Sequence, residues 1–118
     1  MLAHGALLRK NFFSADQLAA VVKDFRNAGL PPEEVAIMSL AQKVSTHPGQ
    51  VGEKDFDELR GFGLTDEEIL DVVLASTARN FFSKTLDALG AVPDEAYLEL
   101  EPELLKVLAP GRPFPGQP

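Results

Sequence analysis

The sequence predicts an all-α fold, and three observations lead to this prediction. Apolar residues recur with the period of a helix along the chain, and no segment shows the strict alternation of a strand. Two segments carry capping boxes, which mark the starts of helices, and a glycine follows several of the predicted helix ends. Over 118 residues this pattern indicates a bundle of about five helices plus short C-terminal turns.

The first helix is expected from Leu2 to Phe12, because the segment is rich in Leu, Ala, Arg and Lys. Ala3 and Leu7 are one turn apart on one face of this helix. Positions 1 to 3 hold no Ser, Thr, Asp or Asn to cap it. Two interpretations stay open: either the first turn frays into water, or the helix begins upstream of Met1.

The second helix follows a capping box formed by Ser14 and Gln17, with Phe13 and Leu18 as a hydrophobic staple. Gly29 is suited to the left-handed position after the last turn. The helix carries one apolar stripe, made of Leu18, Val21, Val22 and Phe25. We therefore expect a surface helix that lies on a core.

The third helix opens with Pro32, Glu33 and Glu34, and Pro48 ends it. Its apolar residues cover most of its circumference, so it is expected to be central and buried. These residues are Val35, Ala36, Ile37, Met38, Leu40, Ala41 and Val44. His47 has no acidic or histidine partner at helical spacing, which favours a partly exposed residue at the helix end over a ligand.

A short fourth helix is expected after Gly52, and Gly61 and Gly63 mark its exit. The longest helix runs from Asp66 to Leu89, about 36 Å at 1.5 Å per residue. It begins with a second capping box and staple and stops at a glycine: Thr65 with Glu68, Leu64 with Ile69, and Gly90. The first half of this helix is apolar nearly all round, so both sides should be covered, in part by a neighbouring subunit.

Six of the nine prolines lie from Pro93 onward, so the composition of the chain changes at that point. Short helical turns are expected at residues 94–98 and 102–108. Residues 110–118 are rich in Pro and Gly and are interpreted as a tail or an interface arm. Residues 1–109 are then expected to form a single domain.

Composition narrows the classes of function. Eleven basic residues are scattered among eighteen acidic ones, and the net charge of −7 argues against nucleic-acid binding. No apolar run approaches the ~20 residues of a membrane span, and no signal peptide is recognisable. The absence of cysteine excludes disulfides and cysteine metal sites within these residues. We expect a cytoplasmic protein with no metal, no cofactor and no membrane partner.

The segment Ala3-His4-Gly5-Ala6-Leu7-Leu8-Arg9 is similar to the motif region of the carboxymuconolactone decarboxylase / alkylhydroperoxidase AhpD-like superfamily, especially its uncharacterised peroxidase-related members. The similarity continues through residues 35–44 and 64–90 and covers most of residues 3–98. In that family a Cys-x-x-Cys pair is followed, after three residues, by a histidine. The same spacing would place the second cysteine immediately before Met1. The chain departs from the family at Ser83-Lys84, where members often have an asparagine.

The resemblance implies an all-helical homo-oligomer, commonly a trimer or hexamer, and a peroxidase that uses a thiol reductant. It implies that His4 relays protons to the redox cysteines, and that a glutamate upstream of them takes part. Neither those cysteines nor that glutamate is among these residues. For the chain as written we expect no peroxidase activity, with His4 at a frayed helix end or a subunit contact.

The remaining candidate is a polar strip on the longest helix: Arg79, Asn80, Ser83 and Lys84. Arg79 could bind a substrate carboxylate, or pair with an acidic residue across an interface. The acidic clusters at residues 33–34 and 66–68 suit the positive ends of helix dipoles, and residues 99–103 are expected to form a solvated rim.

Three hypotheses about function remain, in decreasing order of preference. The first is an AhpD-like thiol peroxidase or disulfide reductase whose cysteines precede Met1. The second is a non-catalytic oligomeric or binding protein on the same scaffold. The third is a lactone decarboxylase-like enzyme that uses His4 as acid and base, for which the sequence offers no convincing further polar groups.

Overall fold

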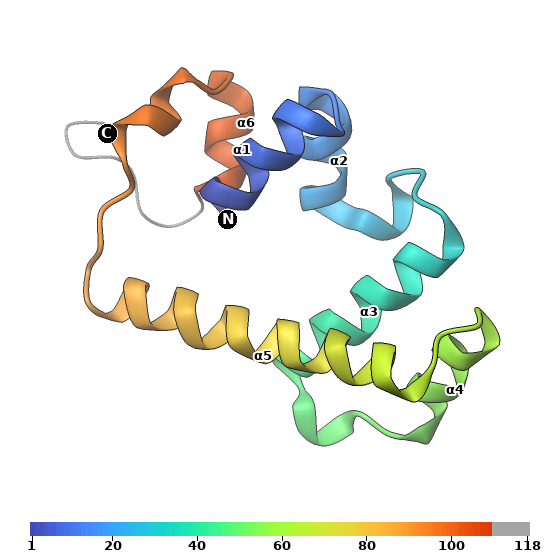
Figure 1. The fold of residues 1–118 in the computed structure, drawn as a ribbon. Helices are drawn as coiled ribbons and strands as arrows, with labels where there is room; N and C mark the ends of the chain where they lie inside the picture. The colour runs from blue at the N-terminus through green and yellow to red at the C-terminus, as the bar shows by residue number, and fades with distance from the viewer. Residues whose placement is uncertain (110–118) are drawn as a thin grey trace. The chain divides into compact units, whose positions relative to one another are not determined.

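The computed structural model describes residues 1–109, and helices make up most of this part of the chain (Figure 1). The α-helices are α1 (Leu2–Asn11), α2 (Ala15–Asp24), α3 (Pro32–Thr46), α4 (Glu53–Gly61), α5 (Asp66–Ala88) and α6 (Pro102–Leu108). Short 3₁₀ turns are η1 (Phe25–Asn27), η2 (Pro48–Gln50) and η3 (Glu95–Glu99). No strand occurs in residues 1–109, which confirms the predicted all-α class. The expected arm at residues 110–118 lies outside the described residues.

Local hydrogen bonds explain where the helices begin and end. Gln17 Oε1 accepts from the Ser14 N–H at 2.9 Å, and the Gln17 N–H donates to Ser14 Oγ at 3.2 Å. Thr65 and Glu68 form the same reciprocal pair, with nitrogen-to-oxygen distances of 2.8 and 3.2 Å. Both predicted capping boxes are therefore confirmed. Three glycines with positive φ follow helical segments: Gly29 (76°), Gly63 (96°) and Gly90 (74°).

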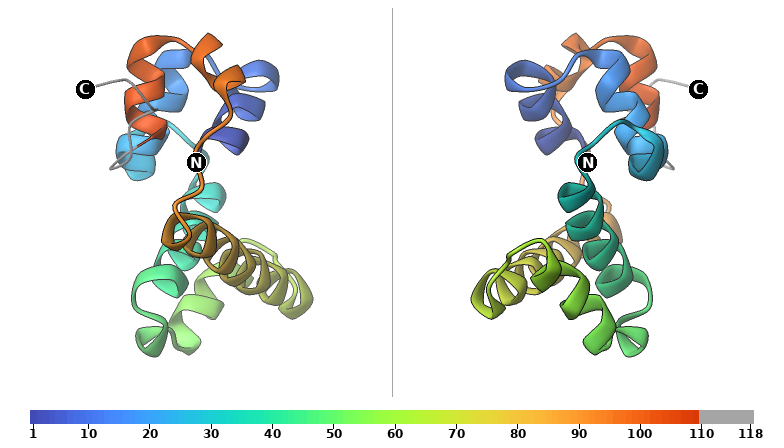
Figure 2. Two further views of the ribbon diagram at one scale, coloured as in Figure 1. Left: turned by 90° about the vertical axis from the view of Figure 1, so that its left-hand side faces the viewer. Right: turned by 90° about the vertical axis from the view of Figure 1, so that its right-hand side faces the viewer.

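The described residues group into two compact units. The first unit contains residues 1–29 together with 91–109, and the second contains residues 30–90. Figure 2 shows the helices of each unit from two further sides. The expectation of a single domain over residues 1–109 stays a prediction.

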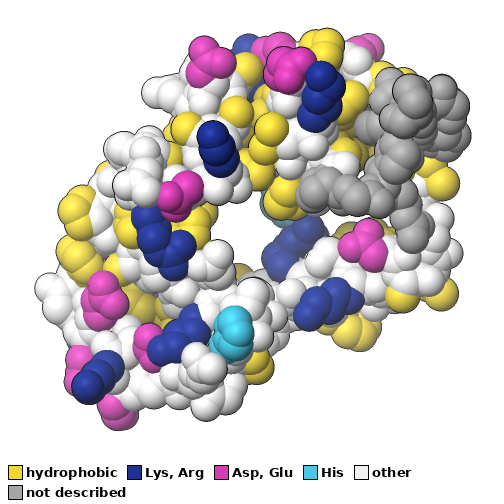
Figure 3. All heavy atoms as spheres, turned by 180° about the vertical axis from the view of Figure 1, so that it is seen from behind, with side chains coloured by type: hydrophobic (Ala, Val, Ile, Leu, Met, Phe, Trp, Pro, Cys, Tyr) yellow, Lys and Arg dark blue, Asp and Glu magenta, His cyan; other side chains and the backbone are white. Residues whose placement is uncertain are grey.

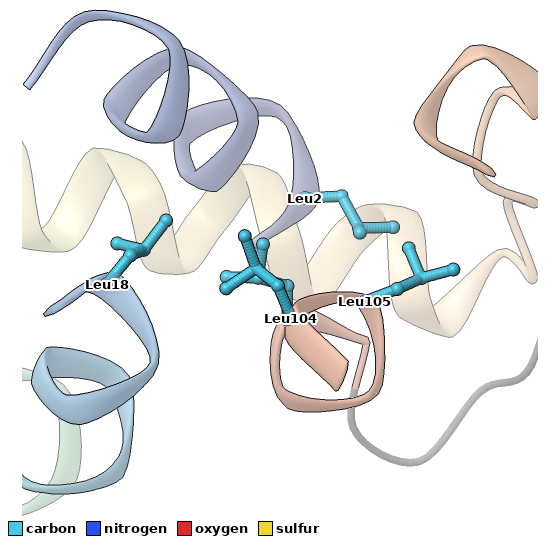
Figure 4. Close-up of a cluster of buried hydrophobic side chains, with 5 residues drawn as sticks. Leu2, Leu18, Leu104 and Leu105 are labelled. Carbon is cyan, nitrogen blue, oxygen red and sulfur yellow. The ribbon is translucent and has the colours of Figure 1, made fainter. Parts of the chain in front are cut away.

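Leucines form the core of the first unit where α1, α2 and α6 meet. Leu2, Leu18 and Leu104 lie close together there, and the last two are 1% exposed (Figure 4). Leu105 and Leu108 from α6 complete the cluster. Residues far apart in the sequence therefore share this core.

The buried face of α1 is not the face that carries Ala3 and Leu7. Ala3 and Leu7 are exposed, whereas Leu2 and Gly5 are buried. The reason is the packing at Gly5: a Cβ atom there would lie only 2.6 Å from both terminal carbons of Leu108. Because glycine has no side chain, α6 can approach α1 at this point.

The core of the second unit lies between α3, α4 and α5. Ala36, Leu40 and Val44 form a buried stripe on α3, against Leu59 of α4 and Ile69 of α5. A further link joins α3 to α4: Lys43 Nζ lies 2.7 Å from Asp55 Oδ2. The remaining apolar side chains of α3 are half-buried, so its predicted central position is confirmed and its full burial is not.

Helix α5 is covered on one side only. Ile69, Val72 and Val73 pack in the core of the second unit, whereas Leu70 and Leu74 on the other side are each 54% exposed. The cover that the sequence predicts is therefore present on one side, and the part expected from a neighbouring subunit stays a prediction. The physical reason for the one-sided cover is that α3 and α4 contact one face of α5, and no other helix of this unit is present to cover the rest.

Candidate functional site

His4 lies in the first turn of α1, and its side chain is exposed. The helix begins after Met1 without a side-chain cap, and the Gly5 N–H donates to the Met1 carbonyl at 2.9 Å. Within residues 1–109 no group hydrogen-bonds to the imidazole of His4. The ring is therefore accessible to a reacting group that these residues do not supply.

The best-defined polar contact near α1 involves Arg9 and not His4. Arg9 Nε donates to Glu101 Oε1 at 2.9 Å, which ties α1 to the residue that precedes α6. This hydrogen bond is the main reason why the pKa of Glu101 lies below its ordinary value. Glu99 and Glu103 are exposed, as expected for a solvated rim, whereas Glu101 is half-buried and pairs with Arg9.

His47 follows the last residue of α3 and is exposed, as the sequence predicts. Its Nδ1 lies 2.9 Å from Thr46 Oγ1, a contact between neighbours in the chain. Its backbone N–H donates to the Lys43 carbonyl at 2.8 Å and closes the helix. His47 therefore has a local structural role at the end of α3.

The predicted polar strip on α5 divides into two parts. Asn80 Nδ2 donates to Ser45 Oγ of α3 at 2.7 Å and to the Ser76 carbonyl at 2.9 Å. Ser83 Oγ donates to the Arg79 carbonyl at 2.7 Å. Asn80 and Ser83 therefore have structural hydrogen bonds. The sequence could have predicted this for Asn80, because its position continues the helical period of the buried side of α5.

Arg79 and Lys84, the basic members of the strip, are exposed. The Arg79 guanidinium lies 5.8 Å from the centre of the Phe82 ring, a cation–π contact within α5. Among residues 1–109 no carboxylate hydrogen-bonds to Arg79. Its guanidinium therefore keeps the capacity to bind an anion or an acidic residue from elsewhere.

Charged side chains are dispersed over the surface that Figure 3 draws, where Lys and Arg alternate with Asp and Glu. Within the described part of the chain, no three His, Asp or Glu side chains come together to hold a metal ion. The acidic clusters of α3 and α5 lie in the first turns of those helices, as predicted. None of the helices in residues 1–109 has the length and apolarity that crossing a membrane requires.

No family model, no curated protein and no solved structure matches this chain. The interpretation of its function therefore depends on the chemistry of its own residues, among which His4 and Arg79 make no side-chain hydrogen bond within residues 1–109.

Proposed function

We propose that this chain is the helical scaffold of an AhpD-like, peroxidase-related protein in which His4 relays protons to redox cysteines. The observation that carries the proposal is the position of His4, exposed in the first turn of α1 with its ring uncommitted. A residue four positions before His4 would lie on the same face if the helix continued upstream. The proposal rests on this placement and on the motif resemblance of residues 3–9.

The proposed chemistry needs a thiolate that these residues do not contain. A thiolate attacks the peroxide, the O–O bond breaks, and the sulfur becomes a sulfenic acid while an alcohol leaves with a proton. A second thiol then condenses with the sulfenic acid, forms a disulfide and releases water. A dithiol reductant restores the pair. His4 would take the proton of the attacking thiol and return it to the leaving alkoxide.

A version of the chain that is extended by Cys-Ala-Ala-Cys directly before Met1 tests this role. We expect the pH profile of iodoacetamide alkylation to show a cysteine with a lowered pKa, and His4→Ala to shift that profile upward. His47→Ala is the matched control, because His47 is also exposed but lies in the other unit. The same extended chain should consume an alkyl hydroperoxide in the presence of dithiothreitol. Identical profiles and rates for His4→Ala and the unsubstituted extended chain would refute the role of His4.

The second candidate function is a non-catalytic oligomeric or binding protein, favoured by the exposed apolar face of α5. The two functions differ in their readouts, since the second requires assembly of the present chain and no hydroperoxide turnover. A homo-oligomer of trimeric or hexameric order, a thiol reductant as partner and a cytoplasmic location stay predictions. A lactone decarboxylase-like activity is not proposed, because no polar side chain of residues 1–109 hydrogen-bonds to His4.

A further inference from the structure

One face of α5 presents large apolar side chains that the other helices of the second unit do not cover. The exposed fractions are 54% for Leu70, 54% for Leu74, 75% for Phe81 and 55% for Phe82. Ala78 lies among them and is also exposed. Contiguous apolar patches of this kind mark interaction sites more often than isolated exposed residues do.

The charges of α5 are segregated along the helix. The acidic residues Asp66, Glu67, Glu68 and Asp71 lie in its first two turns, and no basic residue precedes Arg79. Arg79 and Lys84 follow in its second half, where no acidic residue occurs before Asp87. A parallel pair of such helices would place like charges side by side. An antiparallel pair places the acidic part of each helix against the basic part of the other.

The spacing of these charges fits one register. When a two-fold axis passes beside Ala75, Arg79 of one copy is level with Asp71 of the other. In the same register Lys84 is level with Asp66. At 100° per residue, Asp71 and Arg79 fall on one flank of the apolar face, and Asp66 and Lys84 fall on the opposite flank. A two-fold axis brings each flank against the same flank of the second copy, so Arg79 can pair with Asp71, and Lys84 comes near Asp66, whose carboxylate also pairs with Arg60 of its own chain.

The apolar side chains fit the same register. Phe81 of one copy comes within one residue, about 1.5 Å, of the level of Leu70 of the other, and these two residues lie within 20° of each other around the helix. Leu74 comes within two residues, about 3 Å, of the level of Ala78, so that a large side chain lies beside a small one near the axis. The 23 residues of α5 span about 34 Å. A helix of this length can supply a large part of the surface that a stable interface buries, which is about 800 Å² per partner.

We propose that the exposed face of α5 is the docking surface for α5 of a second copy of this chain, in an antiparallel two-fold pair. This interface does not involve His4, and it stands whether or not the chain supports peroxidase chemistry. Arg79 then has an acidic partner across the interface, Asp71 of the second copy.

The mass of the whole chain in solution, measured by light scattering over a concentration series, tests the proposal. We expect a dimer or a higher oligomer built from dimers, and we expect Phe81→Glu to shift the association to at least tenfold higher concentration. Phe12→Glu is the matched control, because Phe12 is 73% exposed and lies in the other unit. A chain that stays monomeric at all concentrations would overturn the proposal, as would equal effects of the two substitutions. Circular dichroism of each variant confirms that the helices remain.

A charge swap tests the antiparallel register. Arg79→Glu should weaken association, and the double variant Asp71→Arg/Arg79→Glu should restore it. Positions 71 and 79 are about 12 Å apart along one helix, too far for an ion pair within the same copy. Restoration must therefore come from contact between copies. Failure of the double variant to associate better than Arg79→Glu would overturn this register.

Discussion

Replacing Gly5 with alanine tests the packing between α1 and α6. Gly5 is buried, and an added Cβ atom would lie 2.6 Å from two terminal carbons of Leu108. Leu108 is itself only 2% exposed and belongs to the leucine core of the first unit. Either the rotamer of Leu108 or the separation of the two helices must therefore change.

Two opposing effects decide the stability of Gly5→Ala. The substitution favours the helix by up to about 1 kcal/mol, because alanine loses less backbone entropy than glycine on folding. Overpacking of a filled core costs about 1–3 kcal/mol. Since the clashing atoms are the ends of a buried side chain, we expect a net destabilisation of up to about 2 kcal/mol.

Gly61→Ala is the matched control, because Gly61 also lies in a helix and a Cβ atom there would meet nothing within 4 Å. Urea unfolding should show Gly5→Ala less stable than the original chain, and Gly61→Ala equally or more stable. The double variant Gly5→Ala/Leu108→Ala should show a favourable coupling free energy, since the smaller side chain removes the clash. A Gly5→Ala variant as stable as Gly61→Ala would refute the close approach of α1 and α6.

Three further predictions concern a core leucine, a helix cap and an ion pair. Leu104→Ala should lower the free energy of unfolding by about 3–5 kcal/mol, because it leaves a cavity in the core. Hydrogen exchange should detect the lost protection in α1, α2 and α6. Leu98→Ala is the control and should change little, because Leu98 is 44% exposed. Thr65→Ala should destabilise the second unit by about 1 kcal/mol in thermal unfolding, because the first turn of α5 loses its capping hydroxyl. The pKa of Asp55 lies below its ordinary value of 3.8, first because of the hydrogen bond from Lys43. The folded state therefore gains stability from this carboxylate above about pH 4 and loses it as the pH falls through the lowered pKa. Asp55→Asn should reduce this acid sensitivity in urea unfolding measured from pH 6 to 3, and an unchanged pH profile would contradict the role of the pair.

Sequence signals alone are enough to predict the all-α class and most of the helix boundaries. The physical reason is that these signals are local: the capping boxes of Ser14 and Thr65 satisfy hydrogen bonds within three residues. The left-handed glycines after helical segments act over equally short distances. The exposure of His47 followed from the same kind of reasoning, since no partner lies at helical spacing along the chain.

Contacts between distant residues were decided by the tertiary structure alone. Arg9 pairs with Glu101, 92 positions along the chain, and Asn80 bonds to Ser45, 35 positions away. The spacing of residues along one helix does not specify which other helix packs against it. For this reason the sequence did not show that Gly5 packs against Leu108, or which face of α5 the second unit leaves exposed. Helical periodicity identifies an apolar face, but only the packing of the whole chain determines whether that face is covered.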